Sequence, residues 1–154
     1  MIPREYLLPY LTSNAVALVL FATAFRKPRW VRWAAVLIFA LAAWTNTRTA
    51  LTNPLDYQAY VDLAILDLYR DFIVGWFRGH TRWLVLPIAA GQLTIALLLL
   101  INSRLSRWVA VCGALVFLLA IAPLGIGSAF PFSLTYGLAL VIMARRLDDA
   151  ESLV

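Results

Sequence analysis

The chain has 154 residues, of which 63% are hydrophobic and 14% are charged. A water-soluble domain has roughly 45–50% apolar and about 25% charged residues, so this composition excludes an ordinary soluble globular protein. The formal net charge is +5, but the basic residues flank long apolar runs, which is typical of membrane topology and not of nucleic-acid binding. We therefore expect one all-α domain whose first partner is the lipid bilayer.

Five apolar runs approach the ~20 residues that cross a bilayer as a helix. They predict a bundle of five transmembrane helices, at residues 7–25, 33–47, 83–101, 108–124 and 130–144. A basic cluster follows the first run instead of preceding it, which favours a retained helix over a signal peptide. We expect this cluster to contact anionic lipid; its members are Arg26, Lys27, Arg29 and Arg32.

The basic residues also predict an orientation, because cytoplasmic loops carry an excess of lysine and arginine. With the loop after the first run in the cytoplasm, that side holds Arg26, Lys27, Arg29, Arg32, Arg104, Arg107, Arg145 and Arg146. The opposite side holds Arg4, Arg48, Arg70, Arg78 and Arg82. The expected protein is therefore a multi-pass plasma (inner) membrane protein with its N-terminus outside and its C-terminus, a short solvated tail, in the cytoplasm.

Residues 53–82 form the long stretch that does not resemble a membrane span. At 100° per residue, its charged residues gather on one side and its apolar residues on the other. This pattern predicts an amphipathic helix over about 55–77 that lies in the outer interface with its apolar side on lipid or on the bundle. On its wet side Asp67, Arg70 and Asp71 have the spacing of structural ion pairs.

Asp62 is the exception, because its wheel angle places it on the apolar side of that helix. A carboxylate there has to be paired, protonated or open to a wet pocket. Candidate partners are Arg48, His80 and Arg82. A structural ion pair is the favoured interpretation, and an acid that handles protons or contacts a ligand is the alternative.

Four further residues are candidates for a ligand site with Asp62: Trp76, His80, Arg82 and Gln92. A histidine can hydrogen-bond a quinone carbonyl, although a solvated interfacial histidine is the commoner case. Polar groups within spans, such as Gln92, Thr94, Asn14 and Asn46, usually join helices by hydrogen bonds. With one histidine and one cysteine, Cys112, the sequence predicts no metal site and no catalytic residue, and no phosphate-binding loop or nucleophile motif occurs.

The run LYRDFIVGWF, the span LPIAAGQLTIALLLL and the break IAPLGIGSAFP occur in this order. Over residues 33–146 this order resembles the DoxX-like family of small membrane proteins. Members are four-helix membrane proteins, and some are linked to quinone-dependent thiosulfate oxidation. The resemblance implies a helical bundle, offers a quinone as a candidate cofactor and carries over no catalytic residue; the run at 7–25 is additional to it.

Three functions are therefore expected from the sequence. The favoured one is a non-catalytic accessory or assembly subunit of a larger membrane complex, such as an electron-transfer complex. The sequence has much apolar surface for packing but no set of polar residues that would converge on one site, and a catalytic site needs positioned acids, bases or a metal. The second is a quinone-binding oxidoreductase subunit with a pocket at the outer face. The third is a carrier or channel formed by self-association.

Overall fold

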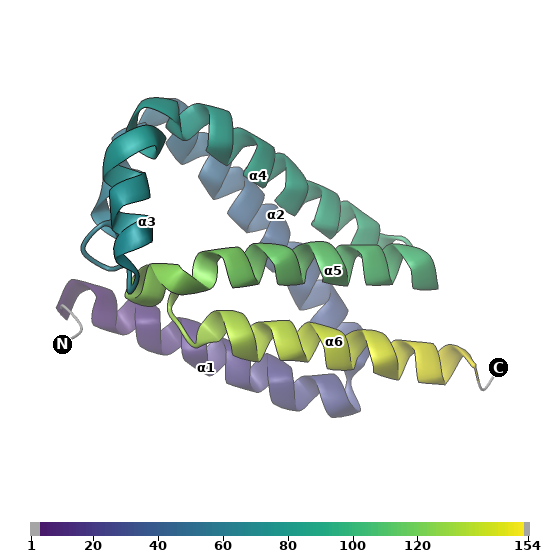
Figure 1. Ribbon diagram of the computed structural model, residues 1–154. Coiled ribbons are helices and arrows are strands. Elements are labelled where there is room, and N and C mark those ends of the chain that lie inside the picture. The colour runs from purple at the N-terminus through teal and green to yellow at the C-terminus, as the bar shows by residue number, and fades with distance from the viewer. Residues whose placement is uncertain (1–3, 153–154) are drawn as a thin grey trace.

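The computed structural model describes residues 4–152, the side chain of Glu5 excepted. Helices make up nearly all of this range, and no strand occurs in it. Five long helices, α1 (Arg4–Arg26), α2 (Pro28–Thr52), α4 (Arg78–Leu100), α5 (Arg104–Ile121) and α6 (Phe132–Glu151), run between the two ends of the molecule (Figure 1). Short helices connect them at one end only: η1 (Pro54–Tyr60), α3 (Asp67–Phe72), η2 (Ile73–Phe77) and η3 (Ala122–Ser128).

The two ends differ in chemistry. We call the end with η1, α3, η2 and η3 the tyrosine end. The other, with Lys27, residues 101–103 and the last turns of α6, is the arginine end. Both are visible in Figure 1, where the C-terminus marks the arginine end.

Within residues 4–152, four helical stretches are long and apolar enough to cross a membrane: Tyr6–Arg26, Pro28–Thr52, Asp67–Leu100 and Arg104–Ser128. The protein is therefore an all-α membrane protein. The run predicted at 130–144 lies in α6, which does not meet the same measure because its last two turns are charged; they carry Arg145, Arg146, Asp148, Asp149 and Glu151.

Helix pairing creates an opening at the tyrosine end. The helix α2 packs along α4, α1 packs along α6, and α5 lies against both α4 and α6. The helices α1 and α2 meet at the arginine end and spread apart towards the tyrosine end (Figure 1). The main hydrophobic core follows these contacts and includes Phe39, Leu99, Val111, Leu118 and Tyr136.

The single amphipathic helix predicted over about 55–77 is wrong, because this range divides into two turns of tight 3-10 helix, a six-residue α-helix and a π-helical turn. The backbone leaves helical geometry between η1 and α3 and again at Gly75 (φ −83°, ψ −110°). The segment crosses the tyrosine end and buries Ile73 and Phe77 against Ala50 and Val85 in a second hydrophobic cluster.

Two glycines in η3 let this segment approach the bundle. Gly125 has a positive φ of 61°, and a Cβ atom there would lie 2.7 Å from the carbonyl oxygen of Leu63. A Cβ atom on Gly127 would collide with the ring of Tyr60. The amide of Ile65 donates a hydrogen bond to the carbonyl of Pro123 (2.9 Å), which fixes the segment to η3.

Candidate binding cavity

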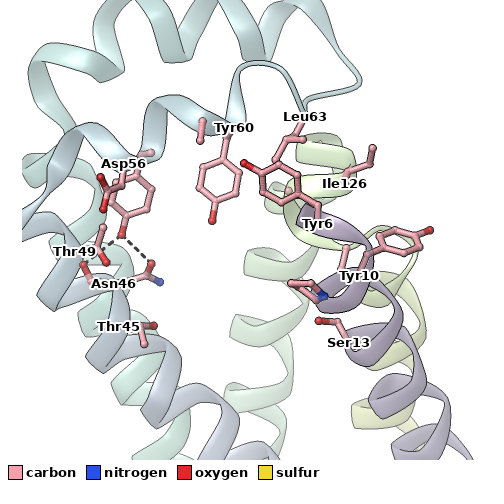
Figure 2. A pocket seen from close by; sticks show the side chains of 15 residues that line it. Tyr6, Tyr10, Ser13, Thr45, Asn46, Thr49, Asp56, Tyr60, Leu63 and Ile126 are labelled. Atoms are coloured by element: carbon pink, nitrogen blue, oxygen red, sulfur yellow. Dashed lines mark hydrogen bonds between the residues drawn. The ribbon is translucent and has the colours of Figure 1, made fainter. Parts of the chain in front are cut away.

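A cavity of about 500 Å³ lies at the tyrosine end, where α1 and α2 diverge beneath η1. Figure 2 shows Asp56, Thr49, Asn46 and Thr45 along one wall, Tyr6, Tyr10 and Ser13 along the opposite wall, and the ring of Tyr60 between them. The remaining lining residues are Pro9, Tyr57, Ala59, Leu63, Ile126, Gly127 and Ala129. This volume is in the range of sites that hold a small organic molecule.

Helical spacing explains which residues of α1 and α2 line the cavity. Tyr6 and Tyr10 are one turn apart on α1, and Thr45 and Thr49 are one turn apart on α2, so each pair lies on one face of its helix. The hydroxyl of Thr45 donates to the carbonyl of Leu41 in its own helix (2.9 Å) and keeps its acceptor lone pairs for the cavity.

A polar chain holds the η1 wall in place. The Tyr57 hydroxyl donates to Oδ1 of Asn46 (3.0 Å), and Nδ2 of Asn46 donates to Oε1 of Gln92 on α4 (2.9 Å). The ring of Tyr57 also packs edge-on against Phe77, with centroids 6.0 Å apart. Asn46 thereby joins three elements, α2, η1 and α4, at the cavity wall.

The electrostatic environment of the η1 wall disfavours negative charge on its tyrosines. Burial, followed by the neighbouring Tyr60 and Asp56, raises the pKa of Tyr57 to about 12. Burial, followed by Tyr6, raises the pKa of Tyr60 above its ordinary value. Both phenols are therefore neutral hydrogen-bond donors at physiological pH.

These groups can donate and accept hydrogen bonds to a bound molecule. The lining offers phenol, hydroxyl and amide groups with a single carboxylate, that of Asp56, beside apolar side chains. Within residues 4–152, no group of three or more His, Cys, Asp or Glu side chains is arranged to hold a metal ion. The arrangement suits an organic molecule with both polar and apolar parts.

Asp62 does not lie in the apolar environment that the sequence predicts for it. Asp62 is exposed, in the turn between η1 and α3, and no described residue forms an ion pair with it. Its predicted burial is wrong, because the wheel angle assumed one continuous helix from Asp56 and the helix ends at Tyr60.

The other predicted ligand residues are not brought together. His80 and Trp76 are both exposed on the outer side of the α4 start, where their rings stack with centroids 4.4 Å apart. Arg82 donates to the carbonyls of Ala50 and Leu51 (3.1 and 3.2 Å), which ties α4 to the last turn of α2. Gln92 is buried and bonds Asn46 from behind the cavity wall. None of these residues lines the cavity.

The predicted ion-pair set is present in part. Arg70 and Asp67 form an ion pair of 2.8 Å on the exposed side of α3. The same guanidinium also donates to the carbonyl of Ala64 (2.8 Å), which closes the turn before α3. Asp71 is exposed and forms no ion pair with any residue between 4 and 152.

Three members of the predicted lipid-binding cluster, Arg26, Lys27 and Arg29, are exposed at the arginine end. Arg32 is different. Its guanidinium donates to the carbonyls of Leu99 (2.6 Å) and Leu100 (3.0 Å), where it satisfies the last turn of α4.

A buried ionic cluster at the arginine end was not predicted. Arg107, at 2% exposure, bonds Asp148 (2.7 Å) and Glu151 (2.6 Å) of α6. The interpretation of the C-terminal residues as a solvated tail is therefore wrong for Asp148, whose side chain is 13% exposed, whereas Glu151 also belongs to α6 but stays 45% exposed. Their spacing of three residues, which places both on one face of a helix, was the available signal.

The cavity residues were missed for a similar reason. Tyrosines near the ends of apolar runs have the composition of an interfacial aromatic belt. The spacings Tyr6–Tyr10 and Tyr57–Tyr60 align each pair on one face, but they do not show that the two faces meet across one space. A scan against protein-family models and searches of curated proteins and of solved structures find no match for this chain.

Proposed function

We propose that this protein is a non-catalytic membrane protein that binds a small amphiphilic molecule in the cavity at the tyrosine end. The observation that carries the proposal is the lining itself, in which phenol, hydroxyl and amide groups from α1, α2 and η1 converge on one space of about 500 Å³. Apolar side chains, Pro9, Leu63 and Ile126 among them, complete the walls. Such a site binds molecules that combine hydrogen-bonding groups with an apolar part.

The proposed topology has five spans, with α6 as the fifth. The helix α6 packs along α1 and α5, so a bilayer that surrounds those helices surrounds α6 as well. The basic residues Arg26, Lys27, Arg29, Arg145 and Arg146 are all exposed at the arginine end. The positive-inside rule then favours that end in the cytoplasm and the cavity at the outer face of the plasma membrane.

Membership of a larger membrane complex is compatible with this binding role and stays a prediction. A quinone, as the DoxX-like resemblance implies, is one candidate ligand, because its carbonyl groups accept hydrogen bonds from phenols such as Tyr60. A homo-oligomeric carrier or channel has no specific observation in its favour.

Filling the cavity with an indole tests the proposal. Thr45→Trp places the new side chain in the cavity, whereas Thr94→Trp is a matched control on α4. Both threonines are exposed, and each hydroxyl donates to a carbonyl four residues earlier at 2.9 Å. Only Thr45 lines the cavity. The three proteins are purified from native membranes in a mild detergent, and the small molecules that they retain are identified by mass spectrometry.

The wild type and Thr94→Trp should retain the same molecule in stoichiometric amount, and Thr45→Trp should lose at least about nine-tenths of it, which corresponds to roughly a hundredfold weaker binding. Equal small-molecule content in all three proteins would contradict the proposed function.

A further inference from the structure

The inference concerns the chemical class of the ligand and rests on the proposed binding function. We infer that the cavity recognises an organic cation, an ammonium group with alkyl substituents, by the faces of its tyrosine rings and by the carboxylate of Asp56.

Four tyrosines line the cavity, two from each side. Tyr6 and Tyr10 belong to α1, and Tyr57 and Tyr60 belong to η1, with the Tyr57 and Tyr60 ring centroids 6.2 Å apart. An aromatic ring carries negative charge density on its face, so several rings around one space attract a cation without taking up a proton or a counter-ion. Quaternary ammonium groups are bound in this way because they have no N–H to donate and present a large, weakly hydrated surface.

Asp56 gives the cavity its sign. Asp56 is the acidic residue among those that line the cavity, and none of the lining residues is Lys, Arg or His. No ion pair joins Asp56 to another residue of the described range 4–152. Its carboxylate is exposed at the cavity wall formed by η1. An unpaired carboxylate beside aromatic rings attracts a cation and repels an anion.

The tyrosines alone do not fix the sign of a bound charge. The raised pKa values of Tyr57 and Tyr60 arise first from burial, which disfavours an ion of either sign. The carboxylate of Asp56 contributes to the shift of Tyr57 after burial and Tyr60, and it is the group that distinguishes a cation from an anion. An anionic ligand is therefore disfavoured relative to a cationic one.

A pair of small probes separates charge from shape. Choline and 3,3-dimethylbutan-1-ol are almost identical in size, but the second has carbon in place of the charged nitrogen. Binding of each is measured by calorimetry with the full-length protein in maltoside micelles, without choline lipids. Choline should bind about tenfold more tightly than the neutral alcohol or better, as expected for a cation that is partly removed from water among aromatic rings.

Variants then assign the preference to residues. Asp56→Asn and Tyr60→Leu should each reduce the choline-to-alcohol affinity ratio by about three- to tenfold, whereas Tyr60→Phe, which keeps the ring, should preserve it. Asp62→Asn is the matched control, since Asp62 is an exposed acid of the same segment outside the cavity. The ratio is measured within each protein, so a partial loss of folded material does not change it.

The outcomes distinguish this inference from the proposed function. If choline and the alcohol bind equally, or if choline does not bind the wild type, the inference is overturned, while the cavity-filling test still decides the proposed function. Nanodiscs distinguish two sources of the cation. Choline binding that is lost in phosphatidylcholine discs but kept in phosphatidylglycerol discs assigns the cavity to lipid head groups. Binding in both assigns it to a free cation.

Discussion

At the scale of single residues, Arg107 shows how this protein places a charge in its interior. The residue lies in the first turn of α5 and is almost fully buried, yet each of its two terminal nitrogens bonds a carboxylate of α6. The indole of Trp108 donates to the second oxygen of Asp148 (2.7 Å), so that carboxylate is held from both sides. The cluster joins the start of α5 to the end of α6.

Removing the buried guanidinium should therefore be costly. Arg107→Gln removes the buried cation but leaves Asp148 with Trp108 and Arg104, and it should destabilise the protein by about 1.5–3 kcal/mol. Arg104→Gln is the control, because Arg104 pairs with the same Asp148 at 3.1 Å but is 76% exposed. The expected loss there is about 0–1 kcal/mol. Thermal unfolding in micelles measures both, and equal losses for the two variants would refute the assigned role of burial.

Tyr57 gives a prediction for alkaline pH. In an unfolded chain its phenol loses its proton near pH 10, whereas the folded protein keeps it up to about pH 12. Between these values the folded state binds more protons than the unfolded state, so stability falls as the pH rises through this window. Thermal unfolding on both sides of pH 10 should show this decline, and Tyr57→Phe should make it shallower. Parallel declines in the two proteins would argue against it.

Sequence reasoning at this scale succeeded for most of the polar residues within spans, although Thr94 bonds the carbonyl of Ala90 in its own helix. Hydrogen bonds between helices were expected for polar groups in the spans, and Asn46 and Gln92 form one. Asn14 on α1 also bonds a distant part of the chain, the carbonyl of Ala129 in the turn after η3 (2.9 Å). The prediction for Asp62 was wrong because its environment depends on where the preceding helix ends. A pattern of angles along an assumed helix does not show that end.

At the scale of elements, the long helices were predictable and the connecting segment was not. The helix α2 extends over Pro28–Thr52, beyond the apolar run predicted at 33–47, and includes polar residues on both sides of that run. Residues 53–77 follow contacts with η3, α2 and α4. Those contacts are long-range, so they override the local amphipathic pattern.

The two glycine environments yield opposite expectations for one substitution. Gly125→Ala requires a positive φ of 61° and a Cβ atom 2.7 Å from the carbonyl of Leu63. We expect it to cost about 1–3 kcal/mol and to loosen residues 61–66 from η3. Gly91→Ala, in α4 with nothing within 4 Å of its Cβ, should stabilise by up to about 1 kcal/mol. Thermal unfolding of the pair tests this, and a gain in stability for Gly125→Ala would contradict the described approach of the segment.

At the scale of the whole molecule, the two ends have separate roles. At the arginine end, the ion pairs of Arg107 join α5 to α6, and Arg32 of α2 donates a hydrogen bond to the carbonyl of Leu99 on α4. The tyrosine end is open between α1 and α2 and is crossed by residues 53–77 (Figure 1). Charge distribution alone predicted which residues share an end. The cavity could not be predicted, because it depends on the angle between two helices that the sequence does not specify.

The central claim is that a solvent-open cavity lies at one end of a membrane bundle, opposite the basic loops. Its most direct test is the reaction of single cysteines with a membrane-impermeant thiol reagent, in a chain whose Cys112 is replaced by alanine. Ser13→Cys lies in the cavity and Asp149→Cys is exposed at the arginine end. In intact cells Ser13→Cys should react and Asp149→Cys should react only after the membrane is opened. Reaction of both from the same side, or no reaction at Ser13→Cys from either side, would contradict the account.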